Sequence, residues 1–514
     1  MGNSRTTNSV LTMAASGLRQ VLTLVFTFLS RTVFIKTLGA EYLGLNGLFS
    51  NVLSILALSE LGIGSAISFY LYSPIANRDY DRIKSLMQFY KKSYRAVGVS
   101  IVVLGTILMP FLPYLVNFNQ DVPVNLYLVY FLYLLNTASS YLFFAYKQAI
   151  VTANQEQYKI EKINIAFTFI NCTVDVLILL LFKNYIIYLI VKFLLVLVKN
   201  IIIAIRIDKE YPFVSEKDYK PLEKTEIKNF FKDIGSVSLF RLGSTLFNAT
   251  DNIIISMILG TIVVGYYSNY YMIISQINMI IGIIIKSFVA GIGNVMTTEE
   301  KNRQYEIYKE LDFFVFGIAI ICTTCLFQLL NSFVNLWIGK NYPSYVLSQS
   351  VVLLLCISFY LDTTMQIPNS FREGSGNFKT GRSLQLLGGI ANIFLSIILG
   401  KKFGLVGIFA ATIIGKGVIT VIPFIIGVSR DVFGFSGFKL LSRYFFNLSV
   451  MVLSLALTWF LGLKFHMTSF GGFILECGIS ITVPFVLILM VYRKLPEMQT
   501  LLRKIKSLKA FKIR

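Results

Sequence analysis

Nine basic residues lie inside apolar segments of this chain, where a charge is costly unless it faces water or a partner. They are Arg19, Arg31, Arg95, Lys192, Lys199, Lys232, Arg241, Lys286 and Lys416. Acidic residues in the same segments are fewer, namely Glu60, Asp175, Asp233, Asp251, Asp362 and Glu476. Guanidinium groups present paired donors to phosphate oxygens, so this excess of basic residues favours an anionic, phosphate-bearing ligand.

Two apolar segments carry polar stripes that we expect to line one cavity. At about 100° per residue, one sector of the first segment holds Ser16, Arg19, Gln20, Thr23, Thr27, Ser30 and Arg31. The segment at 229–258 repeats the pattern with Arg241, Ser244, Thr245, Asn248 and Asn252. Such stripes can also serve only to join helices, but two stripes that both carry arginine favour a water-filled cavity.

The expected depth of these charges suggests a belt. At about 1.5 Å per residue, five charged side chains lie roughly 13 to 18 Å into the membrane; they are Arg19, Glu60, Arg241, Lys286 and Lys416. We therefore predict that a phosphate-bearing ligand binds among Arg19, Arg241, Lys286 and Lys416. Arg31 lies near the outer edge, where it can take over the ligand or simply extend to the membrane interface.

Plainer interpretations of the acids stay open. Glu60 can form an ion pair with Arg19, and this is favoured over a proton-carrying role. Asp175 can pair with Lys192, and Asp362 with Lys416. Asp251 can bind a coupling cation or, as the favoured alternative, a neighbouring helix.

The sequence contains few residues that could form a metal site, a disulfide framework or a nucleotide site. The one histidine, His466, and five scattered cysteines form no pattern typical of a metal site or a disulfide framework. No Gly-Lys pair is followed by Ser or Thr, so no phosphate-binding loop is present. We predict no catalytic residue, metal or cofactor.

The elements that position these residues are membrane helices. Of 514 residues, 55% are hydrophobic and only 14% charged, and apolar stretches run along nearly the whole chain. Segments long enough to cross a bilayer are predicted near 10–35, 43–72, 93–117, 124–146, 163–182, 185–205, 229–258, 262–295, 313–337, 347–371, 383–400, 404–428, 444–463 and 471–492. The fold class is therefore an all-α polytopic membrane protein with about 14 transmembrane helices.

The distribution of basic residues between the loops predicts the orientation of the chain in the membrane. Loops on one side carry 32 basic residues and loops on the other carry six, which predicts that both termini are cytoplasmic. The net charge of +21 is thus explained by topology, and no nucleic-acid partner is expected.

An internal repeat appears at an offset of 221 residues. It places Leu38-Gly39 and Gly44 on Leu259-Gly260 and Gly265, and Asn171 on Asn392. We predict a six-helix lobe at 1–206, a cytoplasmic linker at 207–228, a second six-helix lobe at 229–428, and two extra helices with a basic tail at 429–514. Parallel repeats of this kind are a transporter architecture with a site between the halves.

Three stretches carry a family resemblance: residues 31–44 (RTVFIKTLGAEYLG), residues 374–381 (GSGNFKTG), and Asn392 followed by residues 402–407 (KFGLVG). With them the chain resembles the multidrug, oligosaccharidyl-lipid and polysaccharide (MOP) exporter superfamily, and within it the Wzx-type polysaccharide flippases.

The resemblance implies lobes that alternate between inward-open and outward-open states and a cationic cavity for an undecaprenyl-diphosphate-linked oligosaccharide. The family motifs do not say which residues bind the diphosphate, and we assign it to Arg19, Arg31, Arg241, Lys286 and Lys416. It also implies a bacterial cytoplasmic membrane, a role in capsule, O-antigen or exopolysaccharide synthesis, and polymerase and assembly proteins as partners. The alternatives are a cation-coupled drug exporter of the same superfamily and, less favoured, a membrane glycan polymerase or ligase. The leading prediction is a transporter and not an enzyme.

Overall fold

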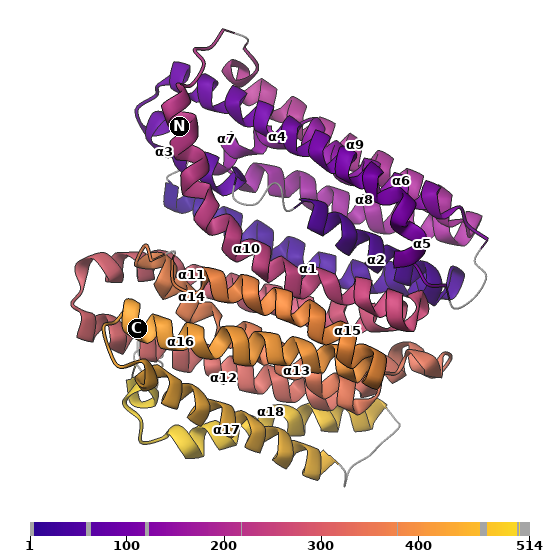
Figure 1. The fold of residues 1–514 in the computed structure, drawn as a ribbon, viewed down its shortest axis with the longest axis vertical. Coiled ribbons are helices and arrows are strands. Elements are labelled where there is room, and N and C mark those ends of the chain that lie inside the picture. The colour runs from indigo at the N-terminus through magenta and orange to yellow at the C-terminus, as the bar shows by residue number, and fades with distance from the viewer. Residues whose placement is uncertain are drawn as a thin grey trace, which may run out of the picture. The chain divides into compact units, whose positions relative to one another are not determined.

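A computed structural model describes residues 5–57, 63–118, 123–216, 218–377, 379–462, 470–500 and 503. Within these residues every regular element is a helix (Figure 1). The first ten α-helices are α1 (Arg5–Thr37), α2 (Ala40–Leu56), α3 (Ile63–Ala76), α4 (Tyr80–Leu108), α5 (Leu112–Leu115), α6 (Leu126–Leu142), α7 (Gln148–Ala153), α8 (Tyr158–Phe182), α9 (Tyr185–Glu210) and α10 (Lys224–Leu259). The others are α11 (Thr261–Thr298), α12 (Lys301–Val334), α13 (Gln349–Thr364), α14 (Gln366–Gly374), α15 (Arg382–Ile413), α16 (Ile422–Asp431), α17 (Gly437–Gly462) and α18 (Phe470–Tyr492).

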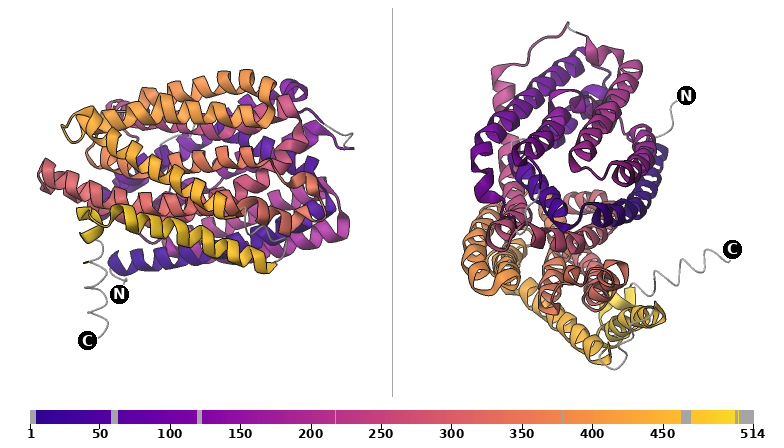
Figure 2. Two further views of the ribbon diagram at one scale, coloured as in Figure 1. Left: turned by 90° about the horizontal axis from the view of Figure 1, so that it is seen from below. Right: turned by 90° about the vertical axis from the view of Figure 1, so that its right-hand side faces the viewer.

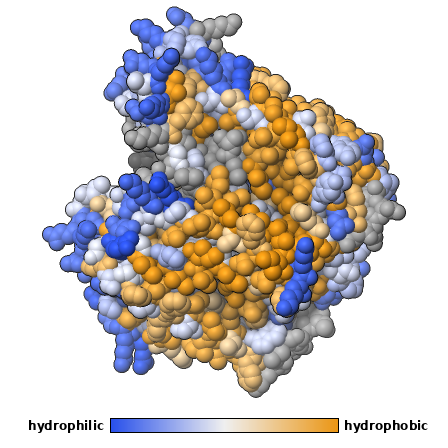
Figure 3. Space-filling model, in the orientation of Figure 1, coloured by the Kyte–Doolittle hydropathy of each residue, from blue (hydrophilic) through white to orange (hydrophobic). Residues whose placement is uncertain are grey.

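The predicted all-α polytopic membrane fold is confirmed. Among the described residues, 11 helical segments are long and apolar enough to cross a bilayer, or 12 if the bent pair of α6 and the segment Ala145–Ala153 forms one span. Large apolar side chains such as Leu181 and Phe394 are exposed, and Figure 3 shows hydrophobic residues over much of the visible face. Such a surface suits a lipid environment.

The count of 14 spans is not confirmed, and two local features account for the difference. The segment Arg382–Asp431 counts as one span although its 50 residues contain Gly404 in a non-helical conformation, with φ 62° and ψ −139°. Helices α2 and α3 have 17 and 14 residues, each below the length of a full span, and residues 58–62 between them are outside the described part.

The chain forms two compact units, Met1–Gly265 and Tyr266–Arg514. The second view in Figure 2 shows the helices within each unit nearly end-on. Helix α10 packs on α2, α3 and α5 and so belongs to the first unit by its contacts. The predicted division into lobes at 207–228 assigns this helix to the second half by the repeat, and it stays a proposal.

Two corners related by the 221-residue offset have matching geometry. Gly39 ends the turn between α1 and α2 with φ 87° and ψ −173°, and Gly260 joins α10 to α11 with φ 97° and ψ 161°. This region is essentially restricted to glycine. The repeat therefore places the same residue type where the same backbone conformation requires it.

One turn further on, the two corners contact each other reciprocally. A Cβ added to Gly44 would overlap the carbonyl oxygen of Thr261, and one added to Gly265 would overlap that of Ala40. The offset carries Ala40 onto Thr261 and Gly44 onto Gly265. We call these four residues the glycine crossing; small residues there allow two helix backbones to touch.

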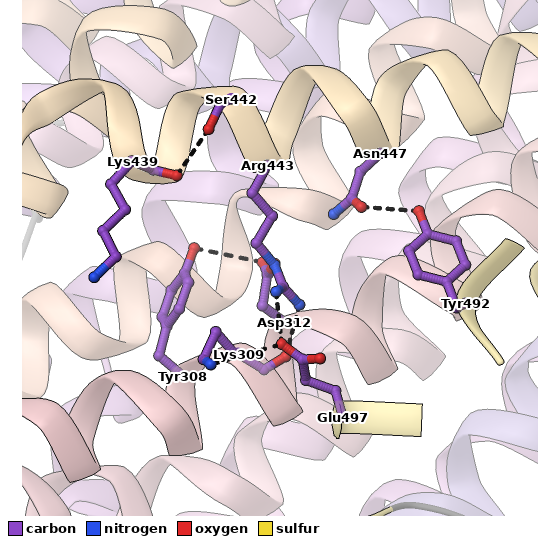
Figure 4. A network of polar contacts seen from close by, with 9 residues as sticks. All are labelled: Tyr308, Lys309, Asp312, Lys439, Ser442, Arg443, Asn447, Tyr492 and Glu497. Atoms are coloured by element: carbon purple, nitrogen blue, oxygen red, sulfur yellow. Dashed lines mark hydrogen bonds and ion pairs between the residues drawn. The ribbon is translucent and has the colours of Figure 1, made fainter. Parts of the chain in front are cut away.

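In the second unit, α17 and α18 pack together and both contact α12. A polar network ties one end of this group (Figure 4). The Arg443 guanidinium lies 2.7 Å from Glu497 Oε1 and 3.5 Å from Asp312 Oδ2, and it donates to the Lys309 carbonyl at 3.2 Å. A second bond, from Tyr492 to Asn447 at 2.8 Å, joins α18 to α17.

Candidate functional site

Helices α1, α8 and α9 build the candidate site in the first unit. Lys183 ends α8 in a left-handed conformation, and the Asn184 side chain caps α9 by accepting from the N–H groups of Ile186 and Ile187 at 2.9 and 3.2 Å. This tight turn makes α8 and α9 an antiparallel hairpin, and α1 packs along α8. Polar residues on three neighbouring helices are thereby brought together.

A cavity of about 370 Å³ lies among these helices and the start of α2. We call it the larger cavity. Its lining combines basic, amide, hydroxyl and aromatic side chains: Arg19, Thr23, Phe26, Thr27, Ser30, Arg31, Phe34, Leu43, Asn46, Thr168, Asn171, Cys172, Asp175, Tyr188 and Lys192. The volume is in the range of small-molecule pockets.

A second cavity, of about 290 Å³, adjoins the first, because both are lined by Arg19, Thr168 and Asn171. We call it the smaller cavity. Its other lining residues are Gln148, Asn164, Phe167, Lys199 and Ile203. Arg19 thus stands where the two cavities meet.

Two ion pairs fix the charges around the cavities. Arg19 Nε lies 2.5 Å from Glu161 Oε2, and Lys192 Nζ lies 2.5 Å from Asp175 Oδ2. Arg19 keeps 34% of its side-chain surface exposed, whereas Glu161 keeps 6%. The guanidinium therefore still faces the cavities while it neutralises a buried acid. The lining holds four basic side chains against Asp175 and the adjoining Glu161, so the positive sign prevails.

An aromatic group borders the larger cavity. Phe34 and Tyr188, with ring centroids 5.5 Å apart, belong to its lining. Behind them the hydroxyls of Tyr133 and Tyr185 are 3.1 Å apart, and the Tyr185 ring lies 4.9 Å from that of Tyr42. Aromatic faces next to amide and hydroxyl groups suit a ligand with both apolar and hydrogen-bonding surfaces.

The structure brings together much of the first predicted stripe. Arg19, Thr23, Thr27 and Arg31 all line the larger cavity. Gln20 is buried against protein instead, and Ser16, half-buried, lies one turn nearer the start of α1, beyond the cavity. Four residues of the predicted stripe thus share one cavity, which ends before Ser16. That these residues bind a ligand stays a prediction.

The second predicted stripe is only partly described. Ser244 and Asn252 line neither cavity. The Asn252 side chain instead donates to the Gly47 carbonyl at 3.4 Å, which joins α10 to α2 and matches the helix-joining alternative. Asp251 is buried and has an interaction partner. The side chains of Arg241, Asn248 and Lys286 are outside the described part.

Two of the expected ion pairs are present, namely Asp175 with Lys192 and Asp362 with Lys416. Lys416 lies in the π-helical segment η7 (Ile414–Val421), 2.8 Å from Asp362 and 3.1 Å from Ser358, so in the second unit it has a local partner.

The expected ion pair between Arg19 and Glu60 stays a prediction. Glu60 is outside the described residues, and Arg19 pairs with Glu161. Sequence reasoning missed Glu161 because α8 begins at Tyr158, earlier than the predicted start at residue 163, and so brings the acid into the bundle.

Among the described residues, no group of three or more His, Cys, Asp or Glu side chains is placed to hold a metal ion. The cavities offer hydrogen-bond donors, positive charge and aromatic faces. Such an arrangement can bind and orient an anionic ligand with hydroxyl groups.

No protein-family model and no curated protein sequence matches this chain. Solved structures do match. An inward-facing multidrug resistance MATE family transporter of the MOP superfamily aligns with a TM-score of 0.64 at 15% identity, covering 79% of this chain and 94% of the other. The lipid II flippase MurJ in an inward closed conformation aligns with a TM-score of 0.68 at 17% identity, covering 95% and 99%.

A third match is a MOP superfamily transporter from Pyrococcus furiosus, described as having a binding pocket of reverse polarity that suggests a different function. Its TM-score is 0.57 at 13% identity, with 83% of this chain and 97% of the other covered. At these identities the similarity establishes the fold. The protein is a multi-pass membrane protein with the fold of MOP superfamily transporters.

Proposed function

We propose that this protein is a flippase that moves an undecaprenyl-diphosphate-linked oligosaccharide across the bacterial cytoplasmic membrane by alternating access, with both termini in the cytoplasm. The observation that carries the proposal is the larger cavity, whose lining joins Arg19, Arg31 and Lys192 to neutral hydrogen-bonding groups. Guanidinium and ammonium groups suit the diphosphate, because both bind phosphate oxygens by charge-assisted hydrogen bonds. No covalent bond is broken in this process.

The neutral lining suits the sugars. Asn46, Asn171, Thr168 and Thr27 offer amide and hydroxyl groups to sugar hydroxyls, and Tyr188 offers an aromatic face. The polyprenyl chain needs no polar site, because it can stay in the lipid beside the apolar helix surfaces. Capsule, O-antigen or exopolysaccharide assembly would then consume the product, with polymerase and other assembly proteins as partners.

A cation-coupled drug exporter is the rival with the same fold. A cavity for cationic drugs needs accessible acids that lack a basic partner. Here Asp175 is held by Lys192 and Glu161 by Arg19, which favours an anionic ligand. The likeness to the lipid II flippase and to multidrug transporters is compatible with both functions.

Binding to the purified protein tests the proposal. We expect a fluorescent polyprenyl-diphosphate-saccharide to bind the wild type and to bind Arg31→Ala about tenfold or more weakly, because one charge-assisted contact is worth about 1.5–3 kcal/mol. For Arg19 the variant is Arg19→Ala with Glu161→Gln, so that no buried carboxylate is left alone. Arg303→Ala, at an exposed ion pair outside the cavities, should bind like the wild type. Equal binding by all variants, or a preference for a cationic drug, would refute the assignment.

A further inference from the structure

Three helices of the second unit, α12, α17 and α18, pack together (Figure 1). They contain buried side-chain oxygens that have no hydrogen-bond partner in the described part of the chain. These oxygens include those of Gln328, Thr458, Glu476 and Ser480, which we call the α18 cluster. Glu476 is 5% exposed, and its Oε2 atom has no hydrogen-bond partner among the described residues. An uncompensated carboxylate at such a place is costly, which makes a missing ligand the first explanation to test.

Contacts between α12 and α18 fix the level of Glu476. Cys325 Sγ lies 3.4 Å from the Ser480 carbonyl oxygen, and the rings of Phe333 and Phe473 lie 6.3 Å apart. The two helices run antiparallel between these contacts. Glu476 lies between Phe473 and Ser480 along α18. It is therefore level with the residues midway between 325 and 333 on α12.

Contacts between α12 and α17 bring Gln328 and Thr458 to the same level. The Gln328 amide packs directly on Gly462, leaving no room for a Cβ there. The rings of Phe327 and Trp459 lie 5.4 Å apart. Thr458 is thus within about one helical turn, 5.4 Å, of Gln328 along the bundle.

The spacing of these residues along α17 and α18 places them on common helix faces. Glu476 and Ser480 are four residues apart and share one face of α18, and Thr458 and Gly462 share one face of α17. One turn nearer the start of α12, Thr324 and Ser454 already join α12 to α17 through hydroxyls 3.0 Å apart. The polar faces of the three helices therefore meet inside the group, where each residue of the cluster is at most 9% exposed.

The donor set has a definite chemistry. It consists of one carboxylate, one amide oxygen and two hydroxyl oxygens, all hard ligands. The single negative charge is neutralised by one monovalent cation, whereas a divalent ion would leave a net positive charge in an apolar surrounding. We propose that the α18 cluster binds a sodium ion, held by Glu476 with Gln328, Thr458 and Ser480. The site is separate from the two cavities and does not depend on what they carry.

Sodium binding by the full-length protein tests this. In detergent micelles at constant ionic strength, with choline chloride replacing sodium chloride, we expect saturable binding of ²²Na⁺ and a melting temperature that rises with sodium. The unfolding equilibrium should shift by about a hundredfold when sodium is a hundred times its dissociation constant. Glu476→Gln keeps the shape and removes the charge, so it should lose both effects.

Two further variants make the result decisive. Thr458→Val removes one ligand oxygen without changing charge and should weaken sodium binding about tenfold, while Glu306→Gln at an exposed ion pair should change nothing. If Glu476→Gln does not fold, Thr458→Val decides, and unchanged sodium affinity in it overturns the proposal. Wild-type protein that binds no sodium, or whose stability responds to pH and not to sodium, overturns it as well, because the carboxyl then holds a proton.

Discussion

The charged side chains around the cavities act in pairs. Lys192 compensates Asp175, and Arg19 compensates Glu161, so each buried acid in the site has a basic partner that remains partly exposed. A pair of this kind lets a positive group face the ligand without leaving a lone carboxylate in a low dielectric. The positive sign of the cavities therefore depends on lysines and arginines that also stabilise the fold.

The pairing predicts strong coupling between Lys192 and Asp175. Lys192→Met alone should lower the stability in micelles by about 1–3 kcal/mol, less than for a fully buried pair because 31% of the lysine side chain is exposed. Lys192→Met combined with Asp175→Asn should recover most of that loss. A double-mutant cycle on thermal unfolding measures the coupling, and additive losses would contradict the pairing.

Glu497 predicts a response to acid. Burial alone would raise the pKa of this carboxyl, but hydrogen bonds from its own backbone N–H and from Arg443 outweigh burial, and the pKa lies below its ordinary value. Its contribution to stability is therefore present above the unfolded pKa and is lost as the pH falls through the lower folded pKa.

Wild-type protein should accordingly lose more stability between about pH 5 and pH 3 than Glu497→Gln, in melting curves recorded across that range. Glu306→Gln, at an exposed ion pair, serves as the control. Identical pH dependence in the wild type and Glu497→Gln would show that the Glu497 carboxylate does not stabilise the fold.

The sequence predicts which face of α1 lines the site, but it does not predict every residue that this face contacts. The face of α1 followed from the helical period, because Arg19, Thr23 and Thr27 recur on one side. The ion pair of Arg19 with Glu161 did not follow, because it depends on where α8 begins and how α8 packs. Asn46 was missed for the same reason, since it reaches the larger cavity only through the turn between α1 and α2.

At the scale of helices, the glycine crossing determines how closely two corners approach. Thr261 is also bound to Asn117 by its N–H and its hydroxyl, at 2.8 and 3.0 Å, so the start of α11 is fixed to the first unit. The sequence repeat located this corner correctly, because glycine is required both by the backbone conformation and by the contact. The number of spans was harder to predict, because kinks and breaks are set by packing.

The crossing predicts equal sensitivity at its two glycines. Gly44→Ala and Gly265→Ala should each lower the melting temperature by several degrees, because a Cβ at either position meets backbone that has no rotamer to change. Gly17→Ala, where an added Cβ meets no atom within 4 Å, should be neutral or slightly stabilising. Alanine tolerated at both positions of the crossing would contradict the contact.

At the scale of the whole molecule, large apolar side chains are exposed on both units. The first unit also contains two cavities that are lined by basic and polar side chains. Hydropathy alone could predict the exterior, and the excess of basic residues indicated the sign of the interior. The repeat assigns helix α10 to the second half of the chain, whereas the contacts of this helix lie with the first unit. The lobe boundary at 207–228 therefore stays a proposal.

We propose that the cavities carry a lipid-linked diphosphate oligosaccharide across the bilayer. The most direct measurement is exposure of a fluorescent polyprenyl-diphosphate-saccharide on the far side of vesicles that contain the purified protein, detected by an impermeant quencher. We expect wild-type and Arg303→Ala vesicles to expose the lipid much faster than empty ones, and Arg31→Ala vesicles to be slowed about tenfold or more. Exposure no faster than in empty vesicles, or an unchanged rate with Arg31→Ala, would contradict the account.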